Sequence, residues 1–171
     1  MTGAGASSAA SRGGARRAAR IAAVQALYQI AFTDRTVEAV LDEFGRWRLD
    51  ARDAAGDRLP SADRELFGGL VRGVAARRDE LDALIRPRLS AGWSPERLDP
   101  VVRAILRAAA WELLGQPETP ARVVIDEYVS VARAFFNDRE PGFVNSVVDG
   151  LARDLRAAEM AGEAPDAGET V

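Results

Sequence analysis

The chain has 171 residues, of which 47% are hydrophobic, and its formal net charge is −3, which suits one globular domain with its own core. Cysteine and histidine are both absent, which excludes disulfides, thiolate chemistry, histidine general bases and zinc sites of the usual nitrogen and sulfur type. No stretch has the length and apolarity of a membrane span or a signal peptide, so we expect a cytoplasmic protein without membrane contact.

The N-terminal segment is basic and rich in small residues. Gly, Ala and Ser make up most of residues 1–14, and we expect this leader to be disordered because nothing in it repays the entropy of ordering. An alanine-rich helix is predicted from Ala15 to about Phe32. Its apolar side is formed by Ile21, Val24, Leu27, Tyr28 and Ala31.

The next two predicted helices flank a loop. The first covers Val37–Leu49 with Thr36 as its cap, and residues 50–60 form the loop. Ser61 can cap the second, whose apolar stripe continues as far as Ile85. Periodicity alone does not show whether this helix bends on the way.

Glycine and proline mark the boundaries further along. Gly92 precedes a new start at Ser94-Pro95. Asp99-Pro100 repeats the pattern of a cap followed by a proline and opens a helix over Val101–Leu114, which Gly115 closes.

The stretch from Thr119 to Phe136 has the widest apolar arc in the chain. Thr119 can cap this helix, and Pro120 suits its first position, where the missing N–H costs nothing. Apolar side chains fill roughly half of its circumference, so we expect it to be the central and most buried helix. Its remaining face is expected to be a solvent-exposed strip of Arg122, Asp126, Ser130 and Arg133.

A last helix is predicted from Phe143 to about Ala157, and residues 158–171 are expected to form a flexible acidic tail. No run shows sustained strand alternation. The sequence therefore predicts an all-α fold, a compact bundle of six to seven helices, in a single domain at residues 15–157.

Four arginines precede the first carboxylate of the chain, Asp34. They are Arg12, Arg16, Arg17 and Arg20. Arg17 and Arg20 project on the same side as the apolar stripe, so either their guanidinium groups are buried or these first turns extend beyond the core. The cluster suits contacts to RNA phosphates, and it equally suits a solvated basic N-terminus.

The motifs of common enzyme sites are absent from the sequence. The carboxylate pairs Asp42-Glu43 and Asp126-Glu127 point about 100° apart on a helix, so neither makes an acid/base dyad. Gly68-Gly69 lies inside a helical stripe, where close packing of helices explains it better than a phosphate loop does. We expect no catalytic residue, no metal site and no cofactor.

Three segments together resemble the NusB family of bacterial transcription antitermination factors. RRAARIAAVQALYQ resembles the basic motif of that family, LRAAAWELL and PARVVIDEYVSVARAF resemble its two middle helices, and FVNSVVDG resembles its final helix. The resemblance implies an all-α fold of two packed helical halves without enzymatic activity. Arg16, Arg17 and Arg20, with Arg12 just upstream, match the arginine-rich RNA-binding motif, and Phe143 and Asn145 match a segment near bound RNA.

The resemblance also implies partners. These are the single-stranded boxA element of ribosomal RNA leader transcripts, the ribosomal protein NusE and, indirectly, the transcription elongation complex. The residues that face NusE are expected near the start of the Val101 helix, and some family members form homodimers. Two alternatives stay open: an RNA-binding domain like that of rRNA cytosine methyltransferases, and a helical adaptor that binds protein but not RNA.

Overall fold

The computed structural model describes residues 4–47 and 62–162, and within these ranges it confirms the all-α prediction. The described residues form eight α-helices, two short 3-10 helices and no strand. No helix among them is long and apolar enough to cross a lipid bilayer. In chain order the elements are α1 (Ala4–Phe32), α2 (Val37–Trp47), α3 (Arg64–Ala76), α4 (Arg78–Ile85), η1 (Arg86–Arg88), η2 (Pro95–Arg97), α5 (Pro100–Gly115), α6 (Ala121–Phe135), α7 (Glu140–Leu155) and α8 (Ala157–Ala161).

Several helix boundaries follow the local chemistry of the sequence. The carboxylate of Asp99 accepts the backbone N–H groups of Val101 and Val102 at 2.8 and 3.3 Å, and Pro100 occupies the first position of α5, as predicted. At α3 the cap is Asp63, which accepts the N–H of Leu66. The predicted cap, Ser61, lies outside the described residues.

The first helix is longer than predicted, and its predicted apolar side is only partly buried, with Val24 and Leu27 in the core. It begins at Ala4 and not at Ala15, consistent with the high helix propensity of its many alanines. Tyr28 and Ala31, predicted to face inward, are exposed, whereas Ala22 is buried. The physical reason is that α1 packs against α2, α3, α5 and α6, and alanines allow these close approaches on more than one side.

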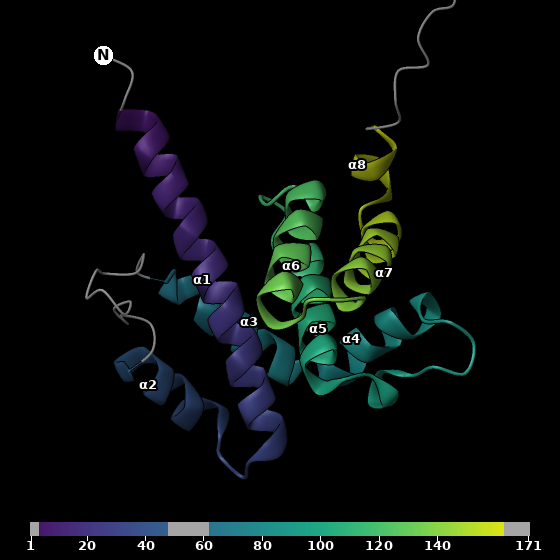
Figure 1. Cartoon of the computed structure of the whole chain (residues 1–171), viewed down its shortest axis with the longest axis horizontal. Helices are drawn as coiled ribbons and strands as arrows, with labels where there is room; N and C mark the ends of the chain where they lie inside the picture. The colour runs from purple at the N-terminus through teal and green to yellow at the C-terminus, as the bar shows by residue number, and fades with distance from the viewer. Residues whose placement is uncertain (1–3, 48–61, 163–171) are drawn as a thin grey trace, which may run out of the picture.

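The helices form two groups that share α5 (Figure 1). One group contains α1, α2 and α3, and the other contains α4 to α8. The central helix is α5, because it packs against α1, α3, α4, α6 and α7, whereas α6 packs against α1, α5 and α7. The prediction that the 119–136 segment is central and most buried is therefore wrong. Alanines of α5 at positions 104, 108, 109 and 110 are buried, and their small side chains let several helices approach it at once.

The solvent-exposed strip predicted on α6 is confirmed for Arg122, Asp126 and Arg133, whereas Ser130 is half-buried. The predicted capping of α6 by Thr119 is not observed. The hydroxyl of Thr119 accepts a hydrogen bond from Arg16 at 3.2 Å, and the first N–H of the helix, that of Ala121, is accepted by Glu159 at 2.6 Å.

Arg156 ties the C-terminal end of α5 to α8. Its guanidinium donates hydrogen bonds to four backbone carbonyls at the end of α5 and in the turn that follows, those of Glu112, Leu113, Gln116 and Thr119, at 2.6 to 3.1 Å. The end of a helix leaves some carbonyls without intrahelical partners, and Arg156 supplies donors there. The chain then continues as α8, with Met160 buried, where a flexible tail was expected from 158. The rest of the predicted tail, from 163, lies outside the described residues.

The glycines of α3 allow it to lie close to α5. The indole of Trp111 occupies the space that a Cβ at Gly73 would need, and it approaches to 3.3 Å from the position of a Cβ at Gly69. Close packing of helices therefore accounts for Gly69, as the sequence indicated, whereas a Cβ at Gly68 would meet Arg72 of the same helix at 3.0 Å.

Candidate nucleic-acid interface

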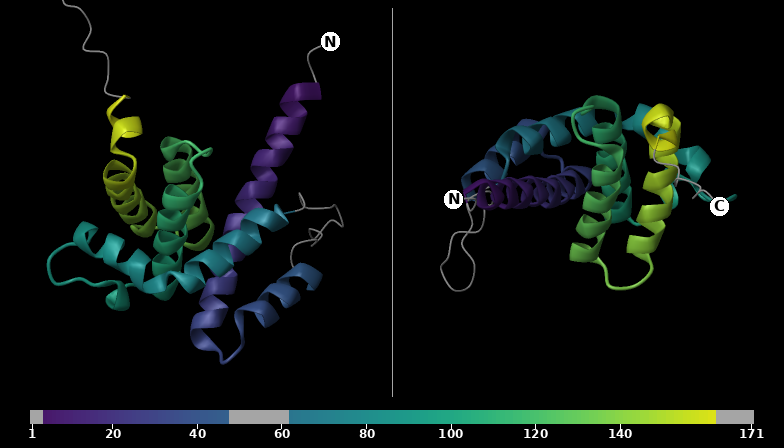
Figure 2. Two further views of the ribbon diagram at one scale, coloured as in Figure 1. Left: turned by 180° about the vertical axis from the view of Figure 1, so that it is seen from behind. Right: turned by 90° about the horizontal axis from the view of Figure 1, so that it is seen from above.

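The N-terminal end of α1 stands apart from the other helices (Figures 1 and 2). It carries Arg12, whose side chain is exposed, and no acidic residue occurs anywhere on this helix. The helix contacts the rest of the protein at Ala15, whose carbonyl accepts the N–H of Asp63, the cap of α3, at 3.0 Å. The end of α1 before this point is therefore a basic arm.

Arg16 and Arg17 lie where the basic arm meets the body. Arg16 donates to the Thr119 hydroxyl and lies 3.8 Å from a carboxylate oxygen of Asp63. Arg17 donates from Nε and Nη2 to the two oxygens of Glu127 at 3.2 and 2.9 Å, and this pairing raises the pKa of Arg17. About half of the Arg17 side chain, 51%, remains exposed, so a phosphate can compete with Glu127 for it.

Arg20 is buried, which is one of the two outcomes that the helical angles allowed. Its side chain is 2% exposed, and Nε and Nη2 each donate to one oxygen of Glu112 at 2.8 Å. Glu112 has no exposed surface and also accepts the hydroxyl of Tyr128, which is equally buried. Arg20 is therefore no direct phosphate ligand in this conformation, because its donors already bind a buried carboxylate.

The electrostatics of this buried cluster favour a charged guanidinium. Burial alone would lower the pKa of Arg20, but its hydrogen bonds to Glu112 and the charge of Glu112 outweigh burial and raise the pKa. Burial, followed by the charge of Glu112, raises the pKa of Tyr128 well above its ordinary value, so the phenol stays protonated and donates. No buried side-chain nitrogen or oxygen among the described residues lacks a hydrogen-bond partner. We call Arg20, Glu112 and Tyr128 the buried clamp.

Phe143 and Asn145 lie in the first turns of α7, and both are exposed, Phe143 to 37%. The structure does not bring them together with the arginines. Arg16 contacts the turn that precedes α6, whereas α7 begins after the opposite end of α6. The exposed strip of α6 lies between them, and Asn145 lines a groove with Arg133 and Asp126 of that strip.

The carboxylate pairs singled out in the sequence take part in ion pairs. Glu127 binds Arg17 and Arg20, and Glu43 binds Arg35. Within the described ranges, no group of three or more acidic side chains could hold a metal ion.

The sequence analysis missed two features of this region. One is the buried carboxylate of Glu112. Its position between Trp111 and Leu113, within an apolar stripe, could have indicated that it is buried and paired with a cation. The other is Trp93, which lies opposite Phe143 and is 56% exposed. A lone tryptophan in a loop gives no signal of this kind, since only the fold brings it near Phe143.

The buried clamp yields a test of stability. Arg20→Met leaves the Glu112 carboxylate buried without its cation, and the free energy of unfolding should fall by about 3 to 5 kcal/mol in urea denaturation. Arg17→Ala removes the same charge from a half-exposed pair and should cost less than about 1 kcal/mol. The double variant Arg20→Met/Glu112→Leu removes both charges and should recover part of the loss, because the buried Tyr128 hydroxyl then lacks its acceptor. Equal stability of Arg20→Met and Arg17→Ala would contradict this view of the clamp.

Comparison with known proteins agrees with the architecture. The NusB family model matches residues 17–153. A protein of Caulobacter vibrioides called transcription antitermination protein NusB is 47% identical to this chain, over 82% of this chain and 94% of the relative. A protein of the same name from Sphingopyxis alaskensis is 45% identical, over 85% of this chain and 97% of the relative. The solved structure of T. maritima NusB superposes with a TM-score of 0.68 at 30% identity, covering 85% of this chain and 96% of that one. The chain belongs to the NusB family.

Proposed function

We propose that this protein is a transcription antitermination factor that binds the boxA element of rRNA leader transcripts together with the ribosomal protein NusE. In this role it acts by binding in the cytoplasm and catalyses no reaction. The observation that carries the proposal is the basic arm with its adjoining arginines, Arg16 and Arg17, on a helix without any acid. Such a surface attracts the phosphates of single-stranded RNA.

The arginines have different roles in this proposal. Arg12, Arg16 and Arg17 contact phosphates, Arg17 by exchanging Glu127 for the RNA. Arg20 is a positioning residue that holds α1 against α5 and α6 through the buried clamp. Phe143 and Asn145 contact bases at the other end of the α6 strip, where salt-independent contacts can add sequence preference.

The relatives favour this function over the alternatives. The similarity covers 94 and 97% of two relatives named NusB, as expected for a NusB-type factor and not for a similarity restricted to a methyltransferase domain. A protein adaptor without RNA binding does not require a basic arm. RNA binding that weakens with salt therefore separates our proposal from the adaptor.

A cluster of exposed apolar side chains at the C-terminal end of α1 supports the NusE partnership. Tyr28 is 43% and Phe32 58% exposed, and their ring centroids lie 4.8 Å apart. With Val101 and Phe135 they line a hollow of about 380 Å³. Val101 opens the helix near which the family resemblance places NusE. We therefore propose that NusE docks on this aromatic cluster, and that the homodimer expected of some family members would use the same surface.

Salt dependence tests the RNA contacts. With three phosphate contacts the slope of log K against log salt should be about −2, at roughly 0.7 per contact, which corresponds to about a twentyfold loss of affinity between roughly 50 and 200 mM salt. Arg17→Ala should reduce the slope by about 0.7 for any single-stranded RNA. The matched control is Arg153→Ala, which removes an exposed ion-paired arginine from α7. If both variants keep the parent slope in filter-binding titrations, Arg17 contacts no phosphate.

The aromatic cluster gives a separate test with NusE. Phe32→Ala should weaken NusE binding about 30-fold or more, as for an exposed aromatic anchor, and should leave RNA affinity measured without NusE unchanged. Val123→Ala, which trims another exposed apolar side chain, on α6, serves as the control. Calorimetric titration with NusE measures both. Unaltered NusE affinity in Phe32→Ala would place the partner elsewhere.

A further inference from the structure

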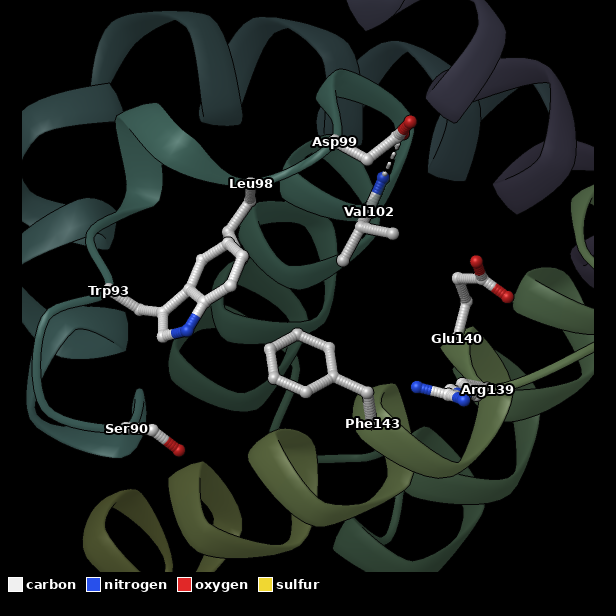
Figure 3. A pocket seen from close by; sticks show the side chains of 8 residues that line it. All are labelled: Ser90, Trp93, Leu98, Asp99, Val102, Arg139, Glu140 and Phe143. Atoms are coloured by element: carbon white, nitrogen blue, oxygen red, sulfur yellow. Dashed lines mark hydrogen bonds between the residues drawn. The ribbon is translucent and has the colours of Figure 1, made fainter.

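A cavity of about 410 Å³ lies between the loop before α5 and the start of α7. Its lining includes Trp93 on one side and Phe143 on the other, and the two aromatic side chains point toward each other from the loop and from α7 (Figure 3). Leu98 and Val102 belong to the same lining and are almost completely buried. The cavity thus has an apolar floor and two aromatic walls, and its volume falls within the range of about 300 to 1,000 Å³ usual for small-ligand sites.

Both aromatic walls are exposed to water although apolar surface is usually buried. Trp93 is 56% and Phe143 37% exposed. The loop that carries Trp93 is nevertheless held in place: the N–H of Trp93 donates to the carbonyl of Ser90 at 3.0 Å, and Arg97 donates to the carbonyl of Gly92 at 2.7 Å. Gly92 has a φ of 84°, which a residue with a side chain adopts only at a cost. The backbone position that carries the exposed indole is therefore fixed by the fold.

The rim of the cavity offers polar groups for one charged or hydrogen-bonding ligand. Arg139 is exposed, and its guanidinium makes no hydrogen bond or ion pair within the described part of the chain. Glu140 and Ser90 supply acceptors at the rim, and Asp99, which caps α5 through its Oδ1, lies there too. Arg139 can bind a phosphate, while Glu140 can accept a hydrogen bond from an amino or imino group of a base.

We propose that this cavity is a base-binding slot, in which one unstacked nucleobase of single-stranded RNA inserts between Trp93 and Phe143. This inference rests on the proposed function and extends it by a residue, Trp93, and by a ligand class. Aromatic rings are the usual platforms for unstacked bases, and Arg139 at the mouth matches the charge of the adjoining phosphate.

The slot continues the predicted RNA surface. Arg17 and Glu127 join the basic arm to α6, and the exposed strip of α6 leads to the groove that contains Arg133 and Asn145. Asn145 and Phe143 lie in the same first turns of α7, about 160° apart around the helix axis, so the groove and the slot flank the N-terminal end of α7. A strand bound to the arm can follow α6, cross this end of α7 and place a base in the slot.

An abasic scan tests the slot. Affinities are measured for a single-stranded boxA oligoribonucleotide and for versions in which one nucleotide at a time lacks its base but keeps its phosphate. For the parent protein, one position should show a roughly 5- to 100-fold loss. Trp93→Ala should lower the affinity for the intact RNA by a similar factor and abolish the loss at that position, with no change in salt slope. Trp93→Phe, which keeps an aromatic ring, is the matched control and should retain most of the affinity.

The outcomes separate the slot from the proposed function. If the parent binds with an Arg17-dependent salt slope but Trp93→Ala binds every oligonucleotide as the parent does, the slot is refuted and the phosphate contacts stand. If the parent shows no salt-dependent RNA binding, the proposed function fails and the slot with it. Because Trp93 is more than half exposed, an unchanged melting temperature of Trp93→Ala will show that the fold is intact.

Discussion

The ion pair between Arg20 and Glu112 is the constraint on which the arrangement of this protein depends. Both side chains are almost completely buried, and a buried carboxylate without a cation costs several kcal/mol. Their paired hydrogen bonds at 2.8 Å fix the position of α1 along α5, and the hydroxyl of Tyr128 adds α6 to the same cluster. One buried contact therefore sets three helices relative to one another.

That contact divides α1 into parts with different tasks. Before it lies the basic arm, and after it lie the buried alanines and then the aromatic cluster at Tyr28 and Phe32. Arg16 and Phe32 are separated by about 24 Å along the helix axis at roughly 1.5 Å per residue. In our proposal, RNA and NusE accordingly occupy opposite ends of one helix, and the buried clamp keeps both ends in place.

Local chemistry made much of the fold predictable from the sequence. The Asp99-Pro100 signal located the start of α5, and the absence of strand alternation gave the fold class. The sequence pointed to α6 as the central helix because the width of an apolar arc gives most weight to large apolar side chains. The central helix is α5, whose buried alanines let neighbouring helices approach closely. Similarly, the first N–H of α6 is accepted by Glu159, which lies on α8. Capping rules consider only residues that are adjacent in the sequence, so they cannot predict this contact.

The candidate site was predictable only where function depends on local charge. Arg12, Arg16 and Arg17 stand out in the sequence because no acid is near them, and the structure leaves them at least partly exposed. The sequence left the burial of Arg20 undecided, because its partners lie 92 and 107 residues away. Trp93 and Phe143 meet only through the fold, so their pairing could not be predicted from spacing.

Hydrogen exchange of backbone amides tests the central claim most directly, because it reports on each part of α1 separately. The amides between Arg20 and Leu27 should be strongly protected, whereas those before Ala15 should exchange rapidly. In Glu112→Gln, protection around Arg20 should fall far more than protection in α4, which supplies no residue of the clamp. If Glu112→Gln lowers protection equally in α1 and α4, or not at all, the buried ion pair is not what holds α1 in place.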